Sequence, residues 1–159
     1  MRFIVLVTSA RRSRTLASTI RNRVRVNQSQ VVLRRDAWEV GVGLYFENRT
    51  ASTVWVVYGY PNLSCGSEGS GVQYSKKGWY FVTPGTDLKV HSGWVGGDAW
   101  FFYAESDAGQ VWAGDYFTTV PNNVFDNCWG VGIGGTARNL GFRRVRPGAE
   151  FMDCTVSFE

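Results

Sequence analysis

Residues 75–93 read SKKGWYFVTPGTDLKVHSG, and this stretch decides the fold class. Aromatic and β-branched residues recur in both halves, as a pleated, half-buried strand favours. Pro84 and Gly85 separate the halves, because proline sets φ for a turn and glycine accepts the positive φ that a turn can require. The stretch therefore predicts a strand, a turn and a second strand. Trp79 and Phe81 are expected on one face of the first strand.

The same pattern continues on both sides of this stretch. Besides 78–84 and 86–93, strands are expected at residues 42–48, 52–61, 99–106, 110–117, 140–148 and 150–159. The last two are expected to form a hairpin, Asp107 to Gly109 a tight turn, and residues 121–137 an irregular segment. Such spacing predicts an all-β fold, a single antiparallel β-sandwich or flattened barrel of about seven to nine short strands.

The final strand is expected to have one buried face and one solvent-facing side. Two sets of side chains alternate along it. The apolar set is Met152, Cys154, Val156 and Phe158, and the polar set is Asp153, Thr155 and Ser157.

Residues 1–40 differ sharply from residues 41–159. They hold nine arginines, two acidic residues and none of the 19 glycines, whereas the remainder holds eight basic and eleven acidic residues. The chain is therefore expected to be an Arg-rich leader joined to one β domain. Three interpretations of the leader stay open: a poorly ordered arm, a short helix over residues 15–26, or a wrongly assigned start with the native protein beginning near Val42. A basic arm suits phosphates, but the acidic remainder argues against nucleic-acid binding.

No targeting signal is visible in the leader. Its apolar run, residues 3–7, is short and precedes the arginines, which reverses the order of a secretory signal. No apolar run approaches the roughly 20 residues that span a bilayer. A cytoplasmic location is the default expectation, with secretion by another route left open.

Several segments resemble a known bacterial family. They are GLYFENRTASTVWVVYGYPN, KKGWYFVTPGTDLKVHSGW and WFFYAESDAGQVWAGDYFTTVPNNVFDNCW, followed by the closing strand. In order and spacing they are similar to the family catalogued as domain of unknown function 1036, over about residues 43–159. The resemblance implies a compact bacterial β domain. It implies no reaction, because that family has no established activity, and no catalytic residue is carried over from it.

The sequence offers little support for catalysis or metal binding. His91 is the one histidine, and Ser92 beside it would point to the opposite face of a strand. Glu105, Asp107 and Asp115 form a loose carboxylate group with Asp98 upstream, which leaves a small carboxylate-based hydrolase as a weaker alternative. The glycine-rich loop at residues 130–135 lacks the Lys-Ser/Thr of a phosphate-binding loop. No enzyme activity, cofactor or metal site is predicted.

The three cysteines allow two interpretations. Cys65 and Cys128 lie in loops and can form a disulfide in an oxidising compartment, or all three thiols stay free in a reducing cytoplasm. Cys154 lies on the apolar face of the final strand and is expected to be buried.

The seven tryptophans carry the functional hypothesis. Trp94, Trp112 and Trp129 are expected in or beside loops, with Asp98 near Trp94. Such rings serve protein interfaces, sugar stacking and membrane surfaces, or they simply cap the ends of the fold. We expect a non-enzymatic module that recognises an unknown protein partner through aromatic loops. A glycan- or lipid-surface-binding module is the alternative.

Overall fold

The computed structural model describes residues 29–32, 41–67, 71–131 and 135–159. Within these ranges the chain forms eleven strands and a short 3-10 helix, so the prediction of an all-β fold is confirmed. The elements are β1 (Ser29–Val32), β2 (Gly43–Asn48), β3 (Val54–Pro61), η1 (Leu63–Ser67), β4 (Tyr74–Val82), β5 (Asp87–Ser92), β6 (Trp100–Ser106), β7 (Val111–Trp112), β8 (Tyr116–Pro121), β9 (Phe125–Cys128), β10 (Ala137–Val145) and β11 (Asp153–Phe158).

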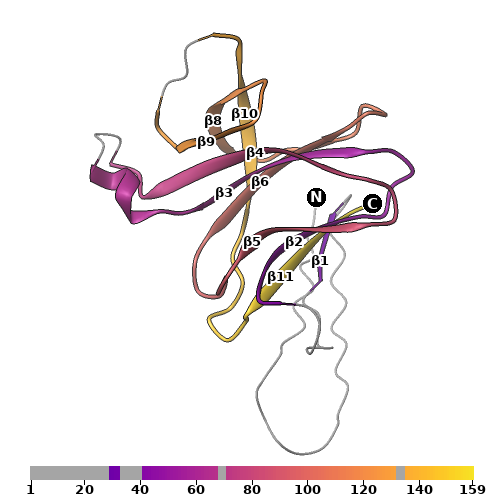
Figure 1. Cartoon of the computed structure of the whole chain (residues 1–159), viewed down its shortest axis with the longest axis horizontal. Helices are drawn as coiled ribbons and strands as arrows, with labels where there is room; N and C mark the ends of the chain where they lie inside the picture. Colours follow the sequence, from indigo (N-terminus) through magenta and orange to yellow (C-terminus); the bar gives the residue numbers. More distant parts are fainter. Residues whose placement is uncertain (1–28, 33–40, 68–70, 132–134) are drawn as a thin grey trace, which may run out of the picture. The chain divides into compact units, whose positions relative to one another are not determined.

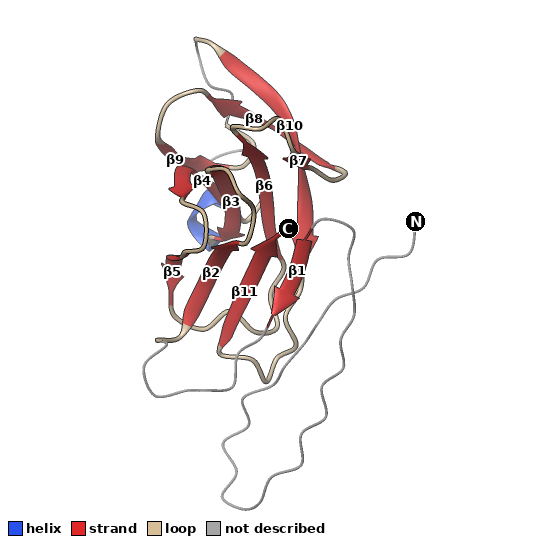
Figure 2. Ribbon diagram, turned by 90° about the vertical axis from the view of Figure 1, so that its right-hand side faces the viewer, coloured by secondary structure: helices blue, strands red, loops and turns tan. Residues whose placement is uncertain are grey.

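The strands are divided between two compact units. The first unit comprises Met1–Ala51, Thr83–Asp98 and Pro147–Glu159, and the second comprises Ser52–Val82 and Ala99–Arg146. In the first unit the strands lie side by side in the order β1-β11-β2-β5 (Figure 2). β11 pairs with β2 in parallel, and the other pairings of this sheet are antiparallel.

Aromatic and aliphatic side chains of β2 and β11 form the buried face of the first unit. The register places Leu44 opposite Cys154 and Phe46 opposite Val156, so alternate residues of both strands share one face. Phe46 also stacks on Phe158, with ring centroids 5.7 Å apart. Cys154 is fully buried as predicted, and this burial raises the pKa of its thiol.

The seven-stranded sheet of the second unit curls towards closure. Its order is β8-β10-β6-β3-β4-β9, with β7 paired to β6. Figure 1 labels β3, β4, β6, β8, β9 and β10 of this sheet. The two outermost strands, β8 and β9, follow each other in the chain with only residues 122–124 between them. A connection of that length spans at most about 14 Å. Both edges of the sheet are therefore held close together, which corresponds to the flattened-barrel form of the prediction.

Side chains of β4, the strand next to the edge strand β9, also form hydrogen bonds to the other edge strand, β8. The indole Nε1 of Trp79 donates to the carbonyl of Pro121 at 2.8 Å. The ammonium of Lys76 donates to Thr118 Oγ1 at 2.9 Å and to the Thr119 carbonyl at 2.6 Å. These side-chain hydrogen bonds connect β4 to β8, two strands that do not pair through their backbones.

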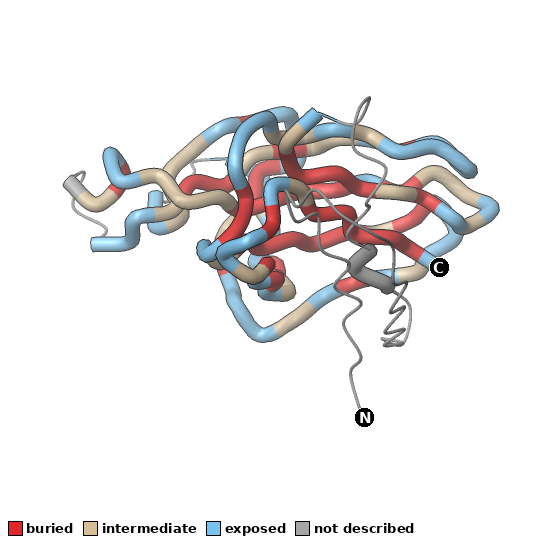
Figure 3. The backbone as a smooth tube through the Cα atoms, turned by 90° about the horizontal axis from the view of Figure 1, so that it is seen from below, coloured by how far each residue is buried: buried red, intermediate tan, exposed pale blue. Residues whose placement is uncertain are grey.

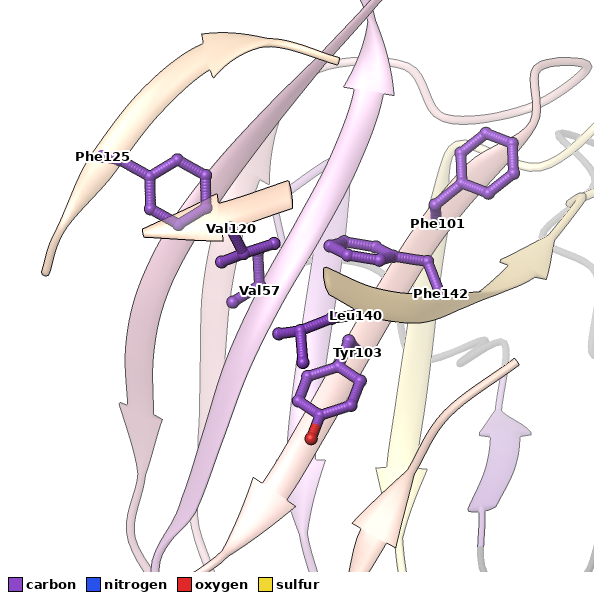
Figure 4. Packing of buried hydrophobic residues seen from close by; sticks show 7 residues of the cluster. All are labelled: Val57, Phe101, Tyr103, Val120, Phe125, Leu140 and Phe142. Atoms are coloured by element: carbon purple, nitrogen blue, oxygen red, sulfur yellow. The ribbon is translucent and has the colours of Figure 1, made fainter. Parts of the chain in front are cut away.

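The core of the second unit is a cluster of seven buried side chains from β3, β6, β8, β9 and β10 (Figure 4). They are Val57, Phe101, Tyr103, Val120, Phe125, Leu140 and Phe142. Figure 3 shows that buried residues follow the strands, while the connecting turns are mostly exposed. Burial of such apolar side chains contributes roughly 1.5–3 kcal/mol each and is the main force that holds the curled sheet.

The predicted hairpin between the last two strands is wrong. β10 pairs with β8 and β6, whereas β11 pairs with β1 and β2. The solvent-facing side predicted for β11 is also wrong, because Thr155 and Ser157 are buried and Met152 is 37% exposed. β11 lies inside its sheet, and the buried Ser157 hydroxyl is satisfied by donating to Glu47 Oε2 at 2.6 Å.

The opening stretch is a strand, a turn and a strand, as predicted. Gly85 has φ of 73°, and the Thr86 amide closes the turn on the Thr83 carbonyl at 3.2 Å. The two strands do not pair with each other, since β4 pairs with β3 and β9, and β5 pairs with β2. The turn that contains Gly109, whose φ is 83°, connects β6 to β7, and these two strands do pair with each other.

The expected number of strands needs correction, and two further expectations concern segments that the structure describes only in part. The described residues contain more strands than predicted, because 110–117 holds all of β7 and the start of β8, and 121–137 contains β9. Part of the leader, β1, pairs with β11. The helix expected at residues 15–26 lies outside the described residues, as does the centre of the glycine-rich loop, residues 132–134.

Candidate functional site

The strand directions of the second unit bring aromatic residues together at one end of the curled sheet. β4 and β6 are both antiparallel to β3, and β6 and β8 are both antiparallel to β10. Consequently β4, β6 and β8 begin at the same end, and β9, antiparallel to β4, finishes there. The residues at those strand ends are Tyr74, Phe101, Tyr116 and Trp129.

A pocket of about 410 Å³ lies at this end of the sheet. A volume of a few hundred cubic ångströms is typical of sites for small ligands or single chemical groups. Five aromatic rings, one valine and one carboxylate line it. The lining residues are Val72, Tyr74, Phe101, Asp115, Tyr116, Phe117 and Trp129.

Phe101 contacts three of the other rings in the pocket. Its centroid lies 5.2 Å from that of Tyr74, 5.0 Å from that of Tyr116 and 5.1 Å from that of Trp129. Phe101 is nearly buried, whereas Tyr116 and Phe117 are exposed. The rings at the mouth therefore rest on a ring that belongs to the core cluster, so the pocket has a packed base.

Two glycines let pocket rings lie directly against the sheet. A Cβ on Gly59 of β3 would lie 2.6 Å from Cζ3 of Trp129, and a Cβ on Gly141 of β10 would lie 3.1 Å from Cε1 of Phe117. Both are closer than ordinary carbon contacts. Glycine inside a strand often marks such close approach, so Gly59 belongs to the construction of the pocket. At Gly141 a Cβ would meet the Gly114 carbonyl oxygen even before the Phe117 ring.

Trp129 is held in place by three further features. Its amide donates to the Tyr74 carbonyl at 2.8 Å, which extends the pairing of β9 with β4. Its carbonyl accepts from Lys76 Nζ at 2.9 Å and from Thr118 Oγ1 at 2.8 Å. The preceding residue, Cys128, forms a disulfide with Cys65 of η1. A ring anchored in this way is preorganised for a ligand.

Lys76 is a fully buried cation whose hydrogen-bond partners are neutral oxygens. Its three N–H groups meet Thr118 Oγ1 and the carbonyls of Thr119 and Trp129. An ammonium has three donors, so all of them are satisfied. Burial lowers the pKa of Lys76 to about 8. The residue acts as an internal brace behind Trp129.

The lining of the pocket carries negative charge. Apart from the two tyrosines, Asp115 is the one ionisable residue among the lining residues that the structure describes, and it is exposed. The guanidinium of Arg144 lies 5.5 Å from the centroid of the Tyr116 ring. One wall of the pocket thus already contacts a cation through its π-system.

The residues that the sequence singled out belong to different units. Trp94, 54% exposed, and exposed Asp98 belong to the first unit, whereas Trp112 and Trp129 belong to the second. Trp112 is fully buried on β7, so it cannot serve as the exposed loop ring that was expected. Trp129 does line a pocket. Trp112 lies on a two-residue strand beside a turn, so the sequence pattern did not indicate that its side chain is buried.

The possible catalytic groups are engaged in structural contacts. Glu105 receives two hydrogen bonds from Arg138, at 2.8 and 2.9 Å, and one from Tyr103 at 2.8 Å. Burial acts to raise the pKa of Glu105, but these hydrogen bonds outweigh it and lower the pKa. Asp107 accepts from Trp55 Nε1 at 2.8 Å. His91 lies on β5, opposite Leu44.

The part of the chain that the structure describes contains no group of three or more His, Cys, Asp or Glu side chains able to hold a metal ion. Within the same residues no helix is both long and apolar enough to cross a membrane.

Most of the pocket residues were missed in the sequence. Tyr74, Phe101, Tyr116 and Phe117 read as ordinary strand residues, because their meeting depends on pairing between distant strands. One signal was available. Gly59 interrupts a strongly β-forming run, YGYP, and indicated close approach of another group.

In comparisons with known proteins, no family model, no curated protein and no solved structure matches the chain.

Proposed function

We propose that the chain is a non-enzymatic binding module that recognises a partner by enclosing one compact group of that partner in the aromatic pocket. The observation that carries this proposal is the pocket itself, about 410 Å³ in volume and lined by five aromatic rings. Buried aromatic anchors supply much of the energy of recognition sites. The bracing of Trp129 by Lys76 and by the disulfide supports a preformed site.

The engagement of the carboxylates favours binding over hydrolysis. Glu105 is held by Arg138, and Asp115 lies in the pocket without a second carboxylate among the lining residues. A glycosidase needs two carboxyl groups on either side of the scissile bond. The pocket therefore suits recognition better than the carboxylate-based hydrolase considered from the sequence.

A glycan- or lipid-surface-binding module remains the second candidate, and one observation favours it. Trp94 of the first unit is 54% exposed, and its Nε1 donates to the Gly96 carbonyl at 3.1 Å. An exposed ring with a fixed orientation suits stacking on a sugar or insertion at a membrane surface. Fluorescence titration with oligosaccharides and with liposomes tests this candidate, since a response that Trp94→Ala removes would support it.

The family and the compartment also stay proposals. The resemblance to domain of unknown function 1036 is compatible with a binding module. The disulfide between Cys65 and Cys128 favours an oxidising compartment over the cytoplasmic default. A count of free thiols in the native protein tests that choice.

The binding proposal is tested with a panel of small probes and two matched variants. Phe117 and Phe81 are 63% and 60% exposed in the same unit, but only Phe117 lines the pocket. Ligand-observed NMR is run with monosaccharides, amino acids, aromatic alcohols and organic ammonium ions. We expect at least one probe to bind the wild type, and Phe117→Ala to weaken binding about tenfold while Phe81→Ala leaves it unchanged.

Two results would overturn the binding proposal. One is that no probe binds the wild-type protein. The other is that Phe81→Ala and Phe117→Ala weaken binding equally, which would place the binding site elsewhere or make the effect non-specific.

A further inference from the structure

The rings of the pocket are inclined to one another and do not form a flat platform. The plane of Phe101 makes angles of 85° with Tyr74, 62° with Tyr116 and 56° with Trp129. The rings that contact Phe101 therefore do not share one plane. A flat sugar or a flat aromatic ligand needs a face parallel to its own, whereas a rounded group can contact rings at all of these angles.

The charge of the lining selects the sign of such a group. Asp115 contributes a carboxylate, and no Lys, Arg or His occurs among the described residues that line the pocket. The faces of aromatic rings carry partial negative charge and attract cations within about 6 Å of the centroid. Rings and carboxylate together favour a positive ligand.

Two cations near the site already have partners within the protein. Lys76 gives its three donors to oxygens of Thr118, Thr119 and Trp129. Arg144 lies over Tyr116 and is absent from the lining. The Tyr116 ring is therefore already engaged in a cation–π contact with Arg144.

Lys76 also shows which contacts an unmethylated ammonium group makes inside this protein. It needs an acceptor oxygen for each of its three N–H groups. Most of the side-chain surface that lines the pocket is aromatic, and its side-chain acceptors are the Asp115 carboxylate and the hydroxyls of Tyr74 and Tyr116. An ammonium whose hydrogens are replaced by methyl groups needs no such acceptors and buries its methyl groups against the rings.

We propose that the aromatic pocket binds a methylated ammonium group, with Tyr74, Phe101, Tyr116, Phe117 and Trp129 contacting its methyl groups and Asp115 balancing its charge. This inference rests on the proposed binding function and specifies the chemistry of the group that the pocket encloses.

The test compares choline with 3,3-dimethylbutan-1-ol, its neutral analogue of nearly the same shape. Calorimetry or ligand-observed NMR is run on the full chain. We expect choline to bind about tenfold more tightly than the alcohol, because only choline gains from the ring faces and from Asp115. Asp115→Asn should weaken choline about tenfold and leave the alcohol unchanged.

Arg144→Gln provides a test of opposite sign. Removing the cation that lies over Tyr116 should strengthen choline binding a few-fold, because a repulsive charge and a competitor for the ring are both lost. A ligand that is anionic, or that needs a hydrogen-bond donor, would instead bind more weakly to this variant. Circular dichroism and thermal melting of each variant check that the fold is retained.

The outcomes separate this inference from the proposed function. If the alcohol binds as tightly as choline, or if other probes bind and choline does not, the pocket binds ligands but the methylated-ammonium inference is wrong. If no probe of the panel binds, both proposals are wrong. Weaker choline binding in Arg144→Gln would also overturn the inference.

Discussion

Lys76 is a buried residue with a charged side chain, and its hydrogen bonds compensate for the loss of water. It is fully buried, and its three hydrogen bonds link β4 to β8 and to the carbonyl of Trp129. The charged form has the hydrogen bonds that it needs, yet burial lowers its pKa from 10.5 to about 8. The protonation state of Lys76, whose ammonium donates to the Trp129 carbonyl, therefore changes in the alkaline pH range.

The first prediction concerns this pH dependence. Between pH 8 and 10.5 the unfolded chain holds the Lys76 proton and the folded chain does not, so raising the pH stabilises the folded state. Relative to Lys76→Met, the wild type should gain about 1.5 kcal/mol in its free energy of unfolding between pH 8 and 9.5. Urea denaturation at several pH values measures this gain.

The neighbouring Lys77 offers a control for that experiment. Lys77 is partly exposed and pairs with Asp126 at 3.0 Å. Lys77→Met should follow the wild-type pH dependence over this range. Equal slopes for the wild type and Lys76→Met would contradict the assignment. Above about pH 10 the buried Tyr103, whose pKa burial raises to about 12, introduces an opposite trend, so the measurement stops below it.

The second prediction concerns Gly59. A methyl group there would lie 2.6 Å from Trp129 Cζ3 and 3.2 Å from Phe101 Cβ, so Gly59→Ala must displace a pocket ring. We expect a loss of about 1–3 kcal/mol in stability and a shifted tryptophan emission. Gly41→Ala is the control, because its Cβ would meet only the flexible end of Lys89. An unchanged spectrum and melting temperature for Gly59→Ala would contradict the packing.

At the scale of elements, the end of β9 depends on the disulfide and on the ladder with β4. Cys128 closes a loop to Cys65 over a sequence separation of 63 residues. β9 is only four residues long and lies at the edge of its sheet. A strand so short gains little from backbone pairing, and the cross-link limits its freedom in the unfolded chain.

The third prediction follows from this cross-link. The double variant Cys65→Ser, Cys128→Ser should lose roughly 4 kcal/mol of stability if loop entropy dominates, and it should bind the pocket ligand more weakly. Denaturant unfolding measures the first effect. Thiol counting on the unreduced, denatured protein should find one thiol, that of Cys154, and three after reduction. Three thiols before reduction would contradict the disulfide.

At the scale of the whole molecule, the pairing of β1 with β11 gives the leader a structural role. β11 lies between β1 and β2, so the four residues Ser29–Val32 cover an edge that would otherwise be open. An uncovered strand edge exposes unpaired N–H and C=O groups and invites association with other chains.

The fourth prediction is that deleting residues 1–40 weakens β11. Hydrogen exchange should speed up in β11 on the amides that face β1, while β3 and β4 of the second unit serve as an internal control. The deleted protein should also associate more at high concentration, which light scattering measures. Unchanged exchange in β11 would show that β1 is dispensable for this sheet.

The sequence by itself determined the fold class and the local turns. Period-two alternation and turn residues act over a few positions, so the strands near residues 43, 54, 87 and 100 and the turns at Gly85 and Gly109 follow from neighbouring residues. The candidates for the disulfide, Cys65 and Cys128, were also visible.

Only the tertiary structure decided which strands pair, which tryptophans are exposed and where the pocket lies. β11 pairs with β1 and β2 instead of β10, Trp112 is buried, and Phe101 meets Tyr116 and Trp129 from distant parts of the chain. The physical reason is that pairing depends on the burial and hydrogen bonding of whole sheets. Local alternation constrains the faces of each strand but leaves its partners open.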